Sequence, residues 1–210
     1  MSGTTGDFDI ELPNLGDERP GLEERDDELE VDVDDTDDDE DDYDDYPEDA
    51  TEDDIDLVVA LYREDGEPMA VALELDLAND LDGLISHLRR IPGDGGALGM
   101  VSLATEVFAL VRVRGKKVQV FLSDAGTVDD WPLCRDIVDY LGVDLPDDDE
   151  DDEDAYPVGD LDILVDTGLP DFELEAIAAD YDEDSVALLE RIATRIKFGT
   201  QFSRAAASFS

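Results

Sequence analysis

The stretch from Gly95 to Ala125 constrains the fold more than any other part of the chain. Apolar residues alternate with other residues in three runs, which predicts three β-strands at about 98–103, 107–114 and 117–123. Gly115-Lys116 separates the last two runs, and a two-residue loop with Gly first suits a type II′ turn. The sequence therefore predicts a hairpin with a defined register.

That register sorts the side chains of the hairpin onto two faces. Val111 and Val113 should lie opposite Val120 and Val118 on a core-facing side. The other side should carry polar and basic residues near the turn, which are Arg112, Arg114, Lys117 and Gln119. We therefore expect one face of this hairpin to pack and the other to be cationic.

The residues around this stretch complete one α+β domain at 55–142. Two alternating apolar runs flank Asp65-Gly66 and predict another hairpin, because Asp-Gly readily adopts the positive φ values of the turn. Apolar residues at helical spacing predict a helix from Leu77 to about Leu88, and Pro132 and Gly142 bracket a second helix. The element order ββαβββα indicates an antiparallel five-stranded sheet with flanking helices.

Acidic residues are concentrated outside this domain. The chain has 62 Asp and Glu against 14 Lys and Arg, and its formal net charge is −48. Residues 1–54 contain only Arg19 and Arg25 as bases, and such a segment cannot bury enough apolar surface to fold. We expect a disordered acidic tail, which either keeps the chain soluble or holds a short motif that orders on a partner.

The C-terminal third begins with another acidic run, which predicts a linker at 143–157. Residues 158–203 show two short helical patterns, the first closed by Gly168, and one longer helical pattern. A segment this small seldom folds alone, so we expect it to dock on the α+β domain or on a partner, followed by a tail at 204–210.

The chain lacks the residues for the commonest catalytic sites. A zinc deaminase needs three or four His and Cys ligands, whereas this chain has one His and one Cys in total. His87 falls beside a helix stripe, and Cys134 lies on a stripe at core spacing, which indicates a buried thiol rather than a nucleophile. We assign no catalytic, cofactor-binding or metal-binding residue and expect a non-enzymatic protein.

Two further patterns have ordinary structural explanations. The glycine-rich segment 93–99 misses the dinucleotide-binding pattern by one position and follows a helix, so we interpret it as a loop. Asp180, Asp182, Asp184 and Glu190 resemble a calcium loop, but Ser185 replaces its glycine and the closing Glu comes one residue early. Capping of the following helix explains these acids better.

The basic residues of the central hairpin form the candidate partner-contact patch, namely Arg112, Arg114, Lys116 and Lys117. One interpretation is a solvated face that pairs with nearby acids. The other is a contact surface for an RNA backbone or an acidic surface, including the chain's own tail.

Several segments together resemble the bacterial tRNA adenosine deaminase-associated proteins. They are EDGEPMAVALEL, LRRIPGDGGALGMVS, FALVRVRGKKVQVFLSDA, DWPLCRDIVDYLG, PVGDLDIL and RIATRIKFGTQF, which span most of residues 55–203. The resemblance implies an accessory protein of a tRNA adenosine deaminase, with tRNA contacted indirectly or through a local patch. It transfers no catalytic residue and implies no cofactor.

Alternatives to this function rest on charge and topology. The acidic runs could mimic nucleic acid on a partner, and the element order resembles the roadblock and profilin-like domains, which implies a scaffold that forms a homodimer. With one cysteine, no secretion signal and no membrane-length apolar run, we expect a soluble cytoplasmic protein.

Overall fold

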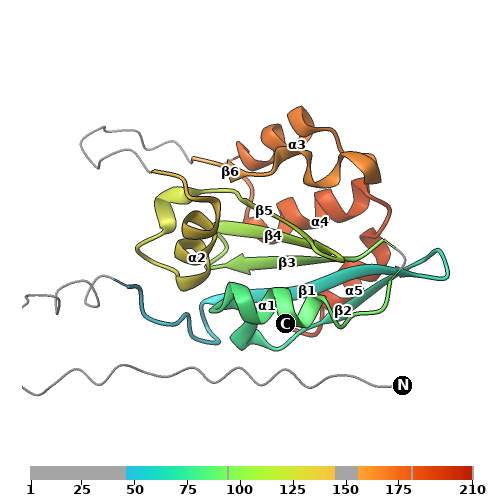
Figure 1. Ribbon diagram of the computed structural model, residues 1–210, viewed down its shortest axis with the longest axis horizontal. Helices are drawn as coiled ribbons and strands as arrows, with labels where there is room; N and C mark the ends of the chain where they lie inside the picture. The colour runs from blue at the N-terminus through green and yellow to red at the C-terminus, as the bar shows by residue number, and fades with distance from the viewer. Residues whose placement is uncertain (1–45, 94, 145–155, 181, 210) are drawn as a thin grey trace, which may run out of the picture. The chain divides into compact units, whose positions relative to one another are not determined.

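The computed structural model describes residues 46–93, 95–144, 156–180 and 182–209. These residues form an α+β fold around one antiparallel six-stranded sheet with the order β2-β1-β3-β4-β5-β6 (Figure 1). The strands are β1 (Ile55–Glu64), β2 (Glu67–Ala72), β3 (Ala97–Leu103), β4 (Val107–Arg114), β5 (Lys117–Leu122) and β6 (Val158–Gly159). The α+β class and the five predicted strands are confirmed, and β6 adds an edge strand.

The two predicted hairpins form with the expected turns. Asp65 and Gly66 have φ of 53° and 82°, and Gly115 has φ of 60° while Lys116 keeps a negative φ, as a type II′ turn requires. Val111 pairs with Val120 and Val113 with Val118, which confirms the predicted register.

A first helical layer covers one face of the sheet. It contains η1 (Leu75–Ala78), α1 (Leu81–Leu88), η2 (Ala125–Thr127) and α2 (Pro132–Leu141). Pro132 is the first residue of α2, and Gly142 ends it in the left-handed conformation, as predicted. The predicted helix from Leu77 is instead divided, because Asp80 caps α1 by accepting a hydrogen bond from the Gly83 N–H.

The residues before β1 pack against this layer. Asn79 donates a side-chain hydrogen bond to the Ala50 carbonyl and accepts one from the Ala50 N–H, and Ala50 is buried. The Tyr46 hydroxyl donates to Asp136 of α2. The packed region therefore begins ahead of the expected boundary at 54, while the rest of the predicted tail, 1–45, lies outside the described residues.

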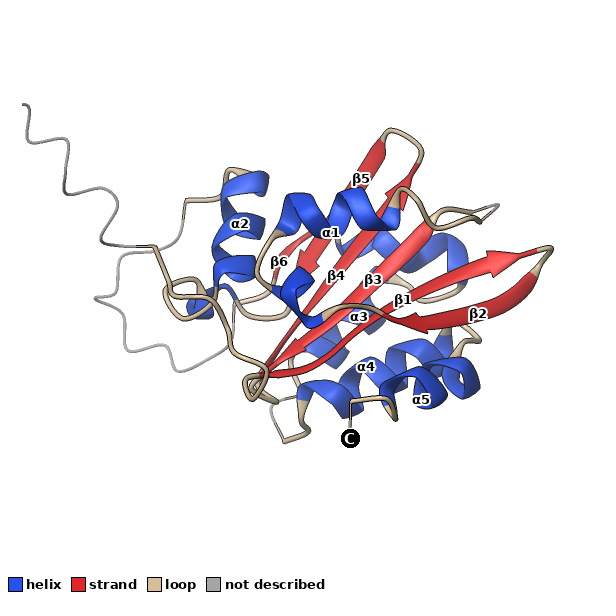
Figure 2. Cartoon of the chain, turned by 90° about the horizontal axis from the view of Figure 1, so that it is seen from below, coloured by secondary structure: helices blue, strands red, loops and turns tan. Residues whose placement is uncertain are grey.

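A second helical layer covers the opposite face, as Figure 2 shows with α4 and α5 below the strands. It contains η3 (Leu161–Thr167), α3 (Asp171–Ala178), α4 (Ser185–Arg195) and α5 (Gly199–Ala206). Its apolar side chains form one buried cluster with residues from β1, β3, β4 and β5, such as Leu61, Met100 and Phe121. The central strands are consequently buried on both faces, whereas the alternation predicted one packed face.

Three details of the C-terminal region differ from the sequence expectations. Val158–Gly159 pairs with β5, and only the residues from Leu161 form the first helical piece, a 3-10 helix that Gly168 ends at φ 102°. Helix α5 buries Phe202 and Ala205, so packed structure continues into the expected tail at 204–210. Most of the expected acidic linker, 145–155, lies outside the described residues.

Candidate functional site

Basic residues gather where β1 and β4 end and β3 and β5 begin. The register runs across four strands there, because Tyr62 pairs with Ala97, Ala97 with Val113, and Arg114 with Lys117. Helix α1 ends at the same place, beside the β4–β5 turn. We call this region the cationic end; its bases are Arg63, Arg89, Arg90, Arg112, Arg114, Lys116 and Lys117.

Arg112 lies inside the protein at this end. It is only 7% exposed, and its Nη1 donates to the Ile163 carbonyl at 2.6 Å and to Asp166 Oδ1, while its Nη2 donates to Asp166 Oδ2 at 3.0 Å. A two-pronged guanidinium–carboxylate pair has a fixed geometry. Arg112 therefore joins β4 to η3 and does not present its charge to a partner.

Arg114 extends the same network toward the surface. Its Nη1 donates to Asp166 Oδ2 at 2.8 Å, and its Nη2 donates to Gln119 Oε1 at 3.0 Å. Gln119 in turn donates to Asp162 at 3.0 Å. The hydrogen bonds from Arg112, aided by the charges of both arginines, hold the pKa of Asp166 below its usual value against the opposing effect of burial. Asp166 therefore stays ionised at neutral pH.

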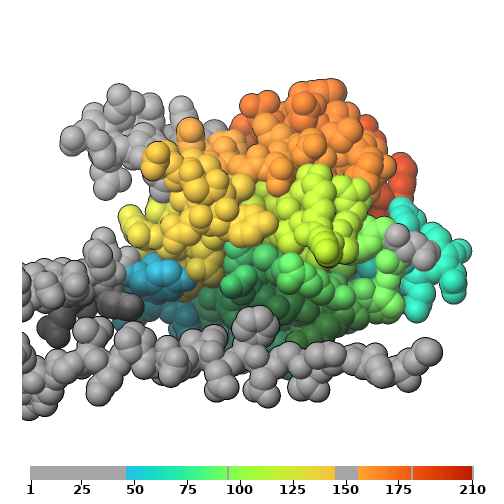
Figure 3. All heavy atoms as spheres, in the orientation of Figure 1, coloured from blue at the N-terminus to red at the C-terminus, as the bar shows by residue number. Residues whose placement is uncertain are grey.

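The other bases of the candidate patch are exposed. Lys116 sits in the β4–β5 turn and Lys117 begins β5, and both side chains face solvent. Figure 3 shows the chain around this turn (lime) at the surface, between the η3–α3 region (orange) and the α1–β3 region (green). The four residues predicted as one patch thus divide into two arginines that bind Asp166 and two exposed lysines.

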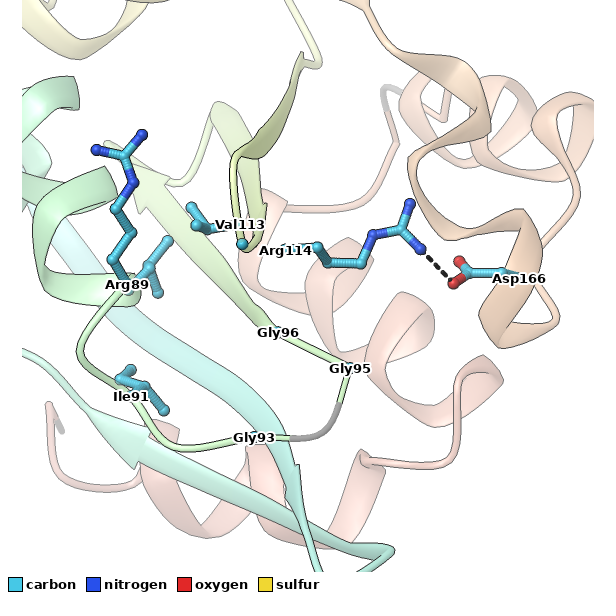
Figure 4. Close-up of a pocket in the computed structure, with 10 residues that line it drawn as sticks. Arg89, Ile91, Gly93, Gly95, Gly96, Val113, Arg114 and Asp166 are labelled. Atoms are coloured by element: carbon cyan, nitrogen blue, oxygen red, sulfur yellow. Dashed lines mark hydrogen bonds and ion pairs between the residues drawn. The ribbon is translucent and has the colours of Figure 1, made fainter.

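A pocket of about 560 Å³ lies beside these lysines. Figure 4 shows its lining, with Arg89 from the end of α1, Arg114 from the end of β4, and the glycine-rich loop between α1 and β3. Leu88, Ile91 and Val113 supply apolar surface, and Asp166 is the acid among the described lining residues. The pocket therefore combines an apolar floor with basic walls.

Sequence reasoning missed the contribution of Arg89 and Arg90, which follow the predicted helix and were not assigned to the patch. Cations are favoured at helix C-termini, so their position has an ordinary explanation as well. The signal that could have revealed them is the pair of arginines followed by Pro92 and three glycines within four residues. Two adjacent basic residues are thereby placed next to a loop whose glycines have no side chains to cover the backbone.

Gly96 packs the glycine-rich loop against β4. Its φ is 78°, and a Cβ atom there would lie 2.1 Å from the Val113 carbonyl oxygen. Only glycine fits such a close approach. Gly95 is different, because a Cβ atom there would meet nothing within 4 Å. The loop therefore packs tightly against β4 at one glycine and stays open at its neighbour.

Arg63, near the end of β1, joins this end of the sheet to the second helical layer. Its guanidinium carbon lies 4.7 Å from the centre of the Phe198 ring, and its Nη2 donates to the Ile196 carbonyl at 3.5 Å. These contacts join the end of β1 to the segment after α4.

The opposite end of the sheet is acidic. A pocket of about 320 Å³ at this end is lined in part by the β3–β4 turn and by the start of α4. We call this region the acidic end; its acids are Glu106, Asp124, Asp180, Asp182, Glu183 and Asp184. Asp184 caps α4 by accepting a hydrogen bond from the Ala187 N–H, as the sequence predicted for this cluster.

The remaining candidates from the sequence lie apart from these surfaces. His87 is half-buried on α1. Cys134 is fully buried, and burial raises the pKa of its thiol to about 12, so it does not form a thiolate at neutral pH. Within the described ranges, no group of three or more His, Cys, Asp or Glu side chains is arranged to hold a metal ion.

Comparison with known proteins identifies the chain's relatives. Residues 56–199 match the model of the Rv3753c-like tRNA adenosine deaminase-associated proteins. The chain belongs to this family. Protein Rv3753c of Mycobacterium tuberculosis (strain ATCC 25618 / H37Rv) is 29% identical over 145 residues, which cover 69% of this chain and 84% of that protein.

The family match contains the sheet except for Ile55, the first residue of β1, together with the cationic end, and it stops at the start of α5. No solved structure matches the chain. The likeness to roadblock and profilin-like domains therefore rests on the order of the elements alone. In the part of the chain that the structure describes, no helix is long and apolar enough to cross a membrane.

Proposed function

We propose that this protein is a non-enzymatic accessory protein that binds a tRNA adenosine deaminase, or the complex of that enzyme with tRNA, through the α+β domain. The observation that carries the proposal is the family match over residues 56–199, because the family is described by its association with that enzyme.

The chemistry of the chain supports an accessory role. A zinc deaminase activates water with a metal held by three His and Cys ligands, and this chain has one of each residue in total. Its Cys134 is buried and stays protonated. The conspicuous surface features are two charged sheet ends, and features of this kind recognise charged partners.

Co-purification tests the proposal most simply. The full chain carrying an affinity tag should retain the tRNA adenosine deaminase of the same organism, and retention is measured before and after nuclease treatment. A binary complex that survives nuclease supports direct binding, and one that needs tRNA supports binding to the enzyme–tRNA complex. If the deaminase is not retained in either condition, with intact tRNA present, the proposal is wrong.

A deamination assay on tRNA measures the consequence of binding. Adding the chain in molar excess over the deaminase should change the rate of inosine formation, while the chain alone should form no inosine. Inosine formation by the chain alone would contradict a non-enzymatic role.

A further inference from the structure

The cationic end is unexpected in a chain with a net charge of −48. Helix dipoles explain why Arg89 and Arg90 follow α1. They do not explain Arg114 and Lys117, which come from strands, or Lys116, which comes from a turn. Bases from the end of α1, from β4, from β5 and from the turn between these strands therefore lie at one end of the sheet, where Arg89, Arg114 and Gly115 line the pocket.

One anionic group, the carboxylate of Asp166, is already bound at this pocket. The Asp166 carboxylate occupies one wall, where it accepts hydrogen bonds from Arg112 and Arg114. Asp166 thereby satisfies the two arginines nearest to it. Arg89 lines the pocket and is exposed, and Lys116 and Lys117, which directly follow the lining residue Gly115, are exposed as well. The site thus has two parts. Asp166 occupies the part formed by Arg112 and Arg114, and a ligand can bind at the part beside Arg89, Lys116 and Lys117.

The shape of this half favours a phosphate chain over an acidic peptide. Gly93, Gly95 and Gly115 are exposed and line the pocket, so a ligand can approach the backbone without meeting side chains. Backbone at a glycine-rich loop commonly approaches phosphate oxygens. The pocket is concave, and its partly exposed Ile91 suits contact with a sugar, whereas extended carboxylate side chains need no concave surface.

We propose that the pocket at the cationic end binds the sugar–phosphate backbone of RNA, with Arg89, Lys116 and Lys117 contacting phosphates. This inference rests on the proposed function and names the part of the enzyme–tRNA complex that this surface takes. Acids that lie more than about 8 Å from the pocket oppose binding only weakly at physiological salt, because their charges are screened. Binding should be independent of base sequence, because the described lining offers charge and shape rather than a set of base-reading groups.

The test is a titration of the full, isotope-labelled chain with a 12-nucleotide single-stranded RNA, followed by backbone amide resonances. We expect shifts at Gly93, Gly95, Gly96 and Gly115, and few at the acidic end. A triple variant with Arg89→Glu, Lys116→Glu and Lys117→Glu should bind at least about tenfold more weakly, and the salt dependence should fall by about two in log–log slope, for about three lost phosphate contacts.

A matched control separates local contacts from overall charge. The variant with Arg135→Glu, Arg191→Glu and Arg204→Glu changes the net charge from −48 to −54, as the first triple variant does, but away from the pocket. It should bind RNA within about twofold of the original chain, as expected when remote charges are screened. Circular dichroism and thermal melting confirm that both variants fold.

Three results would overturn the proposal. The glycine resonances could fail to shift at millimolar RNA and low salt, the two triple variants could lose affinity equally, or polyglutamate could shift the same glycines at least as strongly. The last result would assign the pocket to an acidic peptide. No deaminase is present in this titration, so its failure leaves the proposed function standing, and failed co-purification leaves RNA binding standing.

Discussion

The two ends of the sheet differ in charge and in how that charge is held. Strand β4 has 8 residues, so its two turns lie about 25 Å apart at about 3.3 Å per residue. At the acidic end, Asp184 caps α4 and Asp124 caps η2, while Asp182 and Glu183 face solvent. At the cationic end, Arg112 is buried and tied to another layer.

The difference shows that a charged residue has to be judged by what it contacts. Acids at the acidic end cap loops and helices or remain hydrated, which are common roles in an acidic protein. The cationic end contains a structural pair, Arg112–Asp166, next to the exposed bases Lys116 and Lys117. We therefore expect substitutions of Arg112 or Asp166 to lower stability, and substitutions of the exposed bases to weaken binding.

Gly96→Ala should have the largest effect, because it breaks the loop that shapes the cationic end. The added methyl group would approach the Val113 carbonyl to 2.1 Å at a positive φ. We expect a loss of about 2–4 kcal/mol in the free energy of unfolding, measured by urea denaturation. Gly95→Ala is the control and should change stability by less than about 0.5 kcal/mol; equal losses would show that the loop is not held as described.

Asp166→Asn should have the next largest effect, because it leaves the buried Arg112 without its ionic partner. Asp166 is half exposed, so solvent screens part of the interaction and the expected loss is about 1–2 kcal/mol. Asp182→Asn, at the acidic end, removes the same charge from an exposed carboxylate and should change stability by less than about 0.5 kcal/mol. If Asp182→Asn lowered the free energy of unfolding as much as Asp166→Asn does, the two ends of the sheet would not differ in the way described.

A smaller effect should appear in the pH dependence of stability. The pKa of Asp166 is lower in the folded chain than in the unfolded one, because Arg112 hydrogen-bonds to the ionised carboxylate. Its contribution is complete above its unfolded pKa of about 3.9 and is lost as pH falls through the lower folded value. Asp166→Asn should therefore reduce the loss of stability below about pH 4, and denaturation curves with the same pH dependence would contradict this role.

The sequence was sufficient for features that depend on neighbouring residues. The turns at Asp65-Gly66 and Gly115-Lys116, the pairing of Val111 with Val120, and the end of α2 at Gly142 follow from local backbone preferences. The alternation of Arg112 and Arg114 with valines also assigned them correctly to one face of β4. Local pattern thus specified the strands and their faces.

What covers those faces could not be predicted from the same pattern. Asp166 is 54 residues from Arg112 in sequence, and an arginine on a packed face has the same alternation as one on a solvated face. The two-residue strand β6 is recognisable only from its pairing with β5. Arg89 and Gly96 belong to the site because α1 ends beside the β4–β5 turn, which is a property of tertiary packing.

The measurement that tests the central claim most directly is the affinity of the deaminase–tRNA complex for three forms of the full chain. These are the original chain, the triple variant of Arg89, Lys116 and Lys117, and the control variant of Arg135, Arg191 and Arg204, compared by calorimetry at physiological salt. We predict at least about tenfold weaker binding for the first variant and less than about twofold for the control. Equal affinity of all three forms would contradict the assignment of the cationic end as the contact surface.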